Sequence, residues 1–239
     1  MKKFILSVFV IISFVSVNVI HAQSLDDILA KHFKAVGQEK LVAAKSILVK
    51  AKLSQMGMEM PMEMKIKKPN KFMVTVDMQG QKMIQAFDGE KGWMIMPWIS
   101  PDPQELSGAR LTQAKQQANI LEGELYNYER KGSTADFAGK VNLDGKDAYR
   151  IKLTTSDGNE KDYFIDAESF YISKVKASVS SQGQTMDVEQ IMTEFKTIDG
   201  ITMPTKIITK SPVGNGEIVF EDIRFNVDLD DSIFKHSEN

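Results

Sequence analysis

Five methionines occupy alternate positions from Met56 to Met64, within the run Gln-Met-Gly-Met-Glu-Met-Pro-Met-Glu-Met. An extended chain sends alternate side chains to the same face, so a strand here would place these thioethers in one row. Such a row has three possible uses. Methionine can fill irregular space in a core, it can line an apolar cavity for a ligand of variable shape, and its sulfur can hold a soft ion such as Cu(I).

The metal hypothesis concerns Met58, Met60 and Met62, because ligands two residues apart on a strand are presented together. The chain has no cysteine, and no histidine is close to the row in sequence. More methionines follow on neighbouring predicted strands and spread over an area larger than one ion requires. They are Met73, Met78, Met83, Met94 and Met96. This spread favours cavity lining or core packing over a metal site, and no cofactor is expected.

Two tryptophans flank the same region. Large amphipathic rings suit the mouth of a cavity that takes an apolar ligand with a polar head, although core packing explains them equally well. The proline-rich segment 96–106 beside Trp98 is a candidate gate. The residues expected to line a hydrophobic ligand-binding cavity are Met58, Met60, Met62, Met64, Met73, Trp93, Met94, Met96 and Trp98.

Catalytic patterns are missing from the sequence. Of the 3 histidines, His21 falls in the leader described below, His236 is four residues from the end, and His32 stands beside a phenylalanine on a predicted helix. A serine nucleophile needs a positioned base, and no Gly-rich phosphate loop, His-Glu-x-x-His or calcium-loop pattern is present. We therefore expect a protein that is not an enzyme.

The first 22 residues have the three parts of a secretory signal: Lys2 and Lys3, an apolar run from position 4 to 20, and a small residue, Ala22, before the expected cut. The mature chain, residues 23–239, would then form a single domain, soluble in the periplasm. Loss of the two lysines takes the formal net charge from −2 to −4, which argues against nucleic-acid binding. No later apolar run reaches the ~20 residues of a transmembrane helix.

Helical periodicity appears in two main places. Ser24 with Asp27 three residues on forms a capping box, and Gly37 is a stop signal, so an amphipathic helix is expected between them. A shorter helical piece at 39–44 leads into the strands. Leucines and alanines at helical spacing predict the second main helix over 111–125.

Elsewhere apolar residues recur at every second position, and short turn signals separate about eleven expected strands. The expected ranges are 47–53, 58–67, 71–78, 82–87 and 92–98. Strands resume at about 137, with the further ranges 148–155, 161–166, 172–180, 185–195, 201–209 and 217–225. Such short links permit only antiparallel neighbours. Pro61 is expected at a turn, bulge or edge, the prolines of 97–103 are expected to break the sheet, and the tail is expected to dock Phe234.

A long meander must close or cover its open face. We therefore expect a mainly β (α+β) fold in which a curved antiparallel sheet forms an unclosed β-barrel, with the two main helices as a lid or plug. A monomer is expected.

Four motifs in this order resemble the LolA-like outer-membrane lipoprotein-sorting proteins, in the longer form common in Bacteroidota. They are Phe-Asp-Gly-Glu-Lys-Gly-Trp at 87–93, Asp-Tyr-Phe-Ile-Asp-Ala at 162–167, Asp-Gly-Ile-Thr-Met-Pro-Thr-Lys-Ile at 199–207 and Asp-Asp-Ser-Ile-Phe-Lys at 230–235. The likeness covers nearly the whole chain after the leader.

The resemblance implies a periplasmic carrier whose hydrophobic cavity holds the acyl chains of a lipoprotein or another lipid, with transient membrane-complex partners. Carriers of this family use a cavity arginine in opening and closing, whereas Arg110 and Arg130 here lie in or near the expected lid helix. Two alternatives stay open: a Cu(I)-binding envelope protein that uses Met58, Met60 and Met62, and an envelope-sensing interaction module of the same fold.

Overall fold

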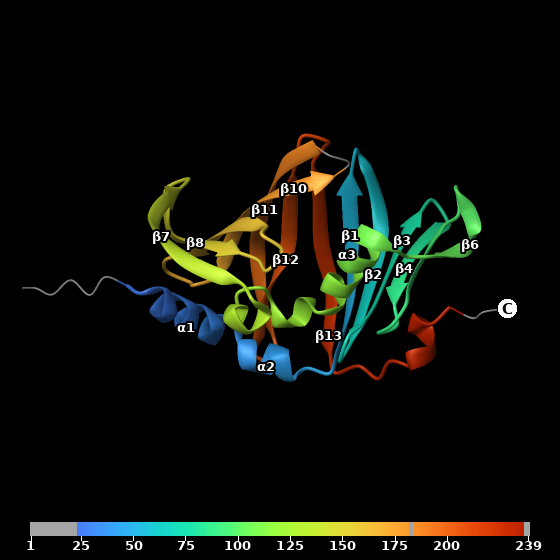
Figure 1. Ribbon diagram of the computed structural model, residues 1–239, viewed down its shortest axis with the longest axis horizontal. Coiled ribbons are helices and arrows are strands. Elements are labelled where there is room, and N and C mark those ends of the chain that lie inside the picture. The colour runs from blue at the N-terminus through green and yellow to red at the C-terminus, as the bar shows by residue number, and fades with distance from the viewer. Residues whose placement is uncertain (1–22, 182–183, 237–239) are drawn as a thin grey trace, which may run out of the picture.

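Thirteen antiparallel strands form one curved, unclosed sheet in the computed structural model, which describes residues 23–181 and 184–236 (Figure 1). The strand order is β6-β5-β4-β3-β2-β1-β13-β12-β11-β10-β9-β8-β7, so β6 and β7 are the two edges. The expected unclosed half-barrel is confirmed, with thirteen strands where about eleven were expected. The expected leader, 1–22, lies outside the described residues.

The chain builds the sheet outward from its middle. The first half comprises β1 (Ser46–Gln55), β2 (Met58–Lys67), β3 (Lys71–Met78), β4 (Gln81–Phe87), β5 (Gly92–Met96) and β6 (Ser100–Glu105). The chain then crosses one face of the sheet through α3 (Gly108–Ala118), η1 (Ile120–Glu122) and η2 (Tyr128–Lys131). This crossing carries it to the far edge.

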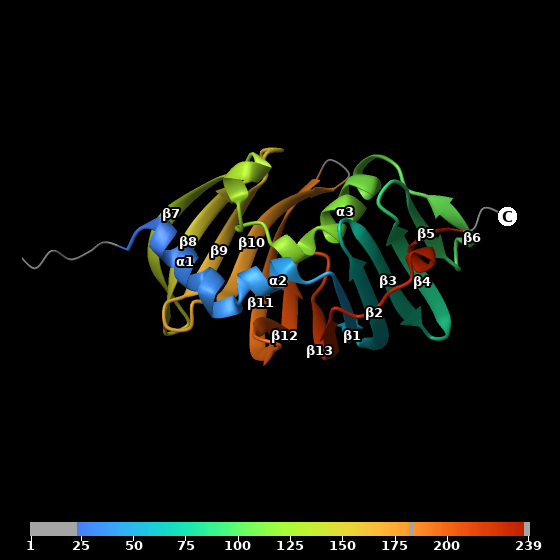
Figure 2. The same cartoon turned by 90° about the horizontal axis from the view of Figure 1, so that it is seen from below.

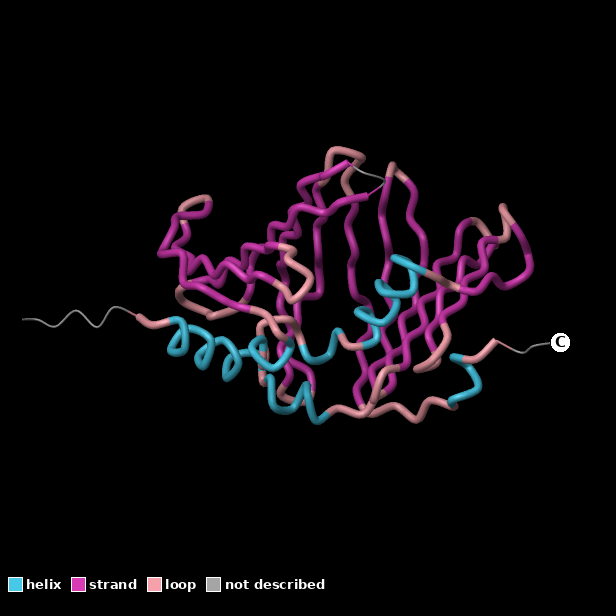
Figure 3. Tube along the Cα trace, viewed as in Figure 1, coloured by secondary structure: helices cyan, strands magenta, loops and turns pink. Residues whose placement is uncertain are grey.

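The second half returns to the middle. It comprises β7 (Thr134–Leu143), β8 (Lys146–Thr154), β9 (Glu160–Asp166), β10 (Ile172–Ser181), β11 (Gln184–Ile198), β12 (Ile201–Lys210) and β13 (Gly216–Phe225). The last strand, β13, pairs with the first, β1, from Ile47 opposite Phe225 to Gln55 opposite Gly216. Strands from the two ends of the chain therefore meet at the centre of the sheet (Figures 2 and 3).

The leading helices follow the expected signals. Ser24 caps α1 (Leu25–Val36), its Oγ accepting a hydrogen bond from the Asp27 backbone at 3.1 Å, and Gly37 ends the helix with a φ of 69°. The short α2 (Gln38–Ala43) continues directly. No helix within the described residues is both long enough and apolar enough to cross a membrane.

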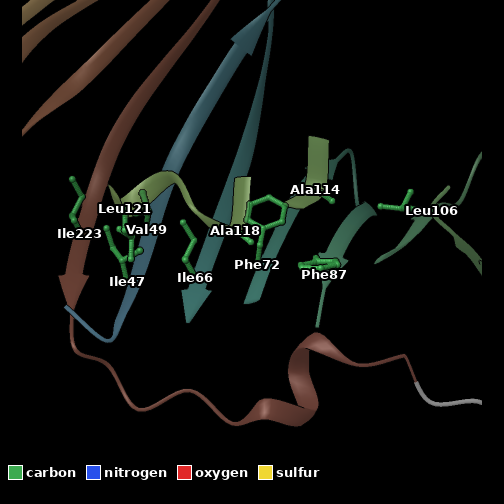
Figure 4. Close-up of a cluster of buried hydrophobic side chains, with 10 residues drawn as sticks. All are labelled: Ile47, Val49, Ile66, Phe72, Phe87, Leu106, Ala114, Ala118, Leu121 and Ile223. Atoms are coloured by element: carbon green, nitrogen blue, oxygen red, sulfur yellow. The ribbon is translucent and has the colours of Figure 1, made fainter. Parts of the chain in front are cut away.

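The helices cover one side of the sheet, which we call the inner face (Figure 2). Ala114 and Ala118 of α3 are almost fully buried there, and their small side chains let the helix approach the strands closely. Figure 4 shows this cluster, which joins α3 and η1 to five strands. Its members are Ile47, Val49, Ile66, Phe72, Phe87, Leu106, Ala114, Ala118, Leu121 and Ile223. A second cluster packs α1 against β8, β9 and the segment before η2.

The structure corrects three local expectations. The segment 97–103 does not end the sheet, because Pro101 and Pro103 lie in β6, an edge strand, where a missing N–H leaves no ladder bond unmade. The helix expected over 111–125 stops at Ala118, and its last part forms the separate turn η1. The expectation of a turn, bulge or edge for Pro61 is not met either: it lies within β2, an interior strand, opposite Lys52 of β1, and the pairing of β2 with β3 begins only at the next residue, Met62.

The C-terminal tail docks on the opposite side of the sheet, the outer face. The expected single turn is η3 (Asp231–Phe234), and Phe234 is fully buried. The indole N–H of Trp93 donates to the Phe234 carbonyl at 2.8 Å. Lys67 and Lys71 donate to the two oxygens of Asp231 at 2.6 and 2.5 Å, and these bonds lower the pKa of Asp231 to about 2.

The Gly37→Ala substitution tests how tightly α1 is held to the β11–β12 turn. A Cβ at Gly37 would lie 2.1 Å from the Gly200 carbonyl oxygen, whereas a Cβ at Gly57, also at positive φ, would meet nothing within 4 Å. Both substitutions carry the left-handed strain of about 1–2 kcal/mol, and only the first adds a clash with backbone. Urea unfolding should therefore show Gly37→Ala less stable than Gly57→Ala by at least about 1 kcal/mol; equal losses would contradict this packing.

Candidate functional site

The pairing of β1 with β2 decides which way the methionine row faces. Directly opposite residues in an antiparallel pair share a face, and Met64 is opposite Val49, Met62 opposite Ala51 and Met60 opposite Leu53. Val49 belongs to the inner cluster, and Met64 packs against that cluster. The even-numbered row of β2 therefore faces the helices.

The same reasoning extends across the sheet. Register and strand alternation place eleven of the 14 methionines on the inner face. They are Met58, Met60, Met62, Met64, Met78, Met83, Met94, Met96, Met186, Met192 and Met203. Of the others, Met1 is outside the described residues, Met56 is in a turn and Met73 faces outward. We call these eleven residues the methionine face.

The helices cover only part of the methionine face. Figure 1 shows α3 and η1 crossing below the upper ends of β1, β2, β12 and β13. Met60 is 7% exposed and Met58 43% exposed, while Met62, Met64 and Met94 are partly exposed. The inner face is therefore an apolar surface that the chain leaves incompletely covered.

Three of the expected cavity residues lie elsewhere. Met73 is opposite Lys65 and Ala86, and Ala86 is in turn opposite Trp93, so Met73 and Trp93 share the outer face. Trp98 lies in the β5–β6 turn and is 49% exposed. The other six, Met58, Met60, Met62, Met64, Met94 and Met96, are on the inner face. Met78 and Met83 were expected to belong to the wider methionine area but not to the cavity lining, and Met186, Met192 and Met203 were not connected with the row at all.

Two polar groups of α3 lie near this apolar surface. The Arg110 guanidinium donates to the Met94 sulfur at 3.7 Å, and no carboxylate in the described part of the chain pairs with it. The Gln117 side-chain oxygen is buried and accepts no hydrogen bond within the described residues.

Polar contacts hold the crossing segment to the rest of the fold. Gln38 donates to the Glu122 carbonyl at 3.0 Å. Glu124 accepts hydrogen bonds from the Tyr163 hydroxyl and, at 2.6 Å, from Lys161. Burial, together with the charge of Glu124, raises the pKa of the Tyr163 hydroxyl. The crossing segment is thus held in place at η1 and at the residues that follow it.

His32 fixes α1 to the turn between β9 and β10. It is 5% exposed, and its Nδ1–H donates to the Phe170 carbonyl at 2.8 Å. Burial lowers the pKa of the imidazole, because the charged form loses its hydration. His32 is therefore neutral at pH 7 and serves packing rather than proton transfer.

A charged groove lies on the outer face. It has a volume of about 590 Å³ and is lined by side chains from β8 to β12. Arg150 holds Asp162 through two hydrogen bonds of 2.7 and 2.9 Å, and Glu189 pairs with Lys174 and Lys176 at 3.4 Å. Because its charges are paired with one another, this groove offers no apolar pocket.

Metal ligation by His and carboxylates finds no support within residues 23–181 and 184–236. No cluster of three or more such side chains there is arranged to hold an ion. Thioether ligation by Met58, Met60 and Met62 is a separate question, since these side chains share one face of β2.

Solved structures with this fold share little sequence identity with this chain but cover most of its length. A DUF1329 family protein from Desulfovibrio piger superposes with a TM-score of 0.60 at 16% identity, covering 87% of this chain and 97% of its own. A LolA superfamily protein from Nitrosomonas europaea gives 0.58 at 17%, covering 89% and 98%. A putative outer membrane lipoprotein-sorting protein domain from Vibrio parahaemolyticus gives 0.58 at 12%, covering 84% and 95%.

These likenesses show that the fold is LolA-like, as the motifs indicated. A family model described as an uncharacterized protein matches residues 65–238, most of the chain. The chain belongs to that family. No curated protein sequence matches it significantly.

The buried imidazole gives this LolA-like chain a pH-dependent stability. Because the folded-state pKa of His32 lies below its ordinary value of 6.5, the unfolded chain binds the proton more tightly, and stability falls as pH drops through that value. The free energy of unfolding in urea should therefore decrease more between pH 7.5 and 5.5 in the wild type than in His32→Asn. Equal pH dependence in the two proteins would contradict the assignment.

Proposed function

We propose that this protein is a non-enzymatic periplasmic carrier or binder of acylated ligands, with lipoproteins sorted to the outer membrane as its cargo. The observation that carries the proposal is the methionine face. Eleven methionines face the helix-covered side of an unclosed sheet, and several stay partly exposed. An apolar surface that is left partly uncovered is typical of a site that binds an apolar ligand.

The chemistry of the methionine face suits acyl chains. Each buried CH₂ of an acyl chain contributes about 0.8 kcal/mol, so several chains need a large apolar area. Methionine is unbranched and polarizable, and it adapts to chains that have no fixed shape. A surface of flexible side chains also forms no single strong contact, which favours release to an acceptor.

Three further observations support the proposal. The leader-like start of the sequence, with Ala22 before the expected cut, directs the chain to the periplasm. The LolA superfamily and outer membrane lipoprotein-sorting neighbours share its fold. Arg110 brings an unpaired cation to the edge of the methionine face, where a ligand's polar head would lie when its acyl chains pack on Met94.

Substitution on the two faces tests the proposal. Met62→Gln and Met83→Gln place a polar group on the inner face, and each buried amide without a partner costs about 1–2 kcal/mol. Together they should weaken binding of a fluorescent acyl probe by at least roughly tenfold. Met73→Gln, on the outer face, is the matched control and should bind as the wild type does. No saturable binding by the wild type, or equal loss in all variants, would refute the proposal.

The Cu(I) alternative predicts that the sulfur atoms of Met58, Met60 and Met62 are needed, and not only their apolar volume. Replacing Met58, Met60 and Met62 by leucine removes three thioethers but keeps their apolar volume. Acyl-probe binding should then change by less than about threefold. If the wild type bound Cu(I) with micromolar or tighter affinity and the triple variant lost that site, the metal function would be supported.

A further inference from the structure

The two ends of the sheet differ in charge. The turns β1–β2, β3–β4, β5–β6 and β12–β13 lie at one end, because alternate hairpins of a meander turn back at the same end. Figure 1 shows this upper end at the top of the central strands. The turn residues there are 56–57, 79–80, 97–99 and 211–215, and they include no charged side chain.

At the opposite end every described turn of the sheet carries charge. Lys68 is in the β2–β3 turn, Asp88 in β4–β5, Asp144 in β7–β8, Glu168 in β9–β10 and Asp199 in β11–β12. At the upper end, the first charged turn is β8–β9, with Asp157, three strands beyond β12. The uncharged stretch therefore covers the turns above the centre of the sheet and above its first half.

Exposed apolar side chains gather at the same uncharged turns. Seven large apolar side chains are exposed within the described residues, and five of them are here. Met56 is 80% exposed, Val213 68%, Ile99 62%, Trp98 49% and Met58 43%. We call these five side chains the apolar rim. They project from three hairpins.

We propose that the apolar rim seats this protein on the surface of a zwitterionic lipid bilayer. The apolar interior of a bilayer strongly disfavours charge, and its interface accommodates tryptophan, aliphatic side chains and small uncharged polar residues, which is the composition of these turns. The expected mature chain has a net charge of −4, so anionic lipids would repel it. Binding to the bilayer would therefore come from the apolar side chains and not from charge.

A protein partner fits these features less well. Interfaces between proteins surround an apolar centre with a polar rim that includes charged side chains. Here the apolar groups are single side chains at separate hairpin tips, and the nearest exposed charged side chains, Glu59, Lys82, Asp102 and Lys210, stand on the adjoining strands rather than in the turns. A fluid lipid surface accommodates separate tips without a complementary shape.

Docking at this end would also give a ligand a path from the bilayer to the inner face. Only this part of the inference rests on the proposed function. Met58, Met78 and Met96 of the methionine face adjoin the uncharged turns. An acyl chain leaving the bilayer at this end would reach the inner face without crossing the charged end of the sheet.

Flotation with phosphatidylcholine vesicles tests the docking. The wild type should float with the vesicles equally well at about 0.05 and 0.5 M salt, since screening weakens only charge-dependent binding. Trp98→Ser combined with Ile99→Ser should reduce the bound fraction at least fivefold, and Met56→Ser with Val213→Ser should act similarly. Ile120→Ser removes an equally exposed apolar side chain from η1 and is the matched control, with no effect expected.

Brominated lipid provides a second readout. Bromine in the upper acyl chain should quench the fluorescence of Trp98, and the quenching should vanish in Trp98→Phe, which retains Trp93 against the tail. All rim variants should still bind the acyl probe in solution, so failure of docking and failure of the carrier proposal are separable. Wild-type protein that does not float, that requires anionic lipid, or that loses binding equally in Ile120→Ser would overturn the inference.

Discussion

An open antiparallel sheet has one apolar face that must be covered, and the chain has only a few helical residues with which to cover it. The close packing of α3 and η1 on the strands is the interaction on which the rest depends. It requires small residues on both sides. Ala114 is fully buried, and a Cβ on Gly92 of β5 would lie 3.0 to 3.3 Å from the side chains of Leu106 and Leu111. The helix fits against the sheet because small residues meet large ones: Ala114 and Ala118 pack in the same cluster as Phe72 and Phe87, and Gly92 leaves room for Leu111.

This packing divides the inner face into a fixed part and an adaptable part. Where α1, α3 and η1 contact the sheet, the side chains are mainly branched or aromatic, and they are buried among one another. Met64, Met94 and Met203 pack against the first of these clusters, and the other eight residues of the methionine face belong to neither cluster. Polar links through Gln38 and Glu124 hold the crossing segment in place, so adaptation to a ligand falls to the flexible side chains. The uncharged turns lie at one end of the methionine face, so the surface proposed to bind a ligand adjoins the turns proposed to dock on the bilayer.

Much of the fold could be predicted from the sequence because its signals are local. The capping box at Ser24, the Gly37 stop and the hairpin turns each depend on a few neighbouring residues, and the structure confirms them. The facing of strands is different, because it depends on the register that each turn imposes. The three-residue turn between β2 and β3 keeps even positions opposite even ones, whereas the two-residue turn between β3 and β4 places even opposite odd.

For that reason the methionine row was correctly recognised as one surface, while its neighbours were only partly assigned. Met73 and Trp93 fell on the outer face, and Met83 joined the inner one. Trp93 is also committed to the Phe234 carbonyl, a contact between residues 141 positions apart that no local pattern predicts. Strand β6 was missed because prolines argue against a strand only when it has two neighbours.

The proposed carrier function requires that an acyl ligand lie on the methionine face. An acyl probe carrying a photoreactive diazirine, activated after binding and mapped by mass spectrometry of the cross-linked peptides, would locate it most directly. Labels should fall on inner-face residues of β2 to β5, such as Met62 and Met83, and competition with unlabelled ligand should remove them. Labels concentrated on Met73 or in the charged outer groove around Arg150 and Asp162 would contradict the account.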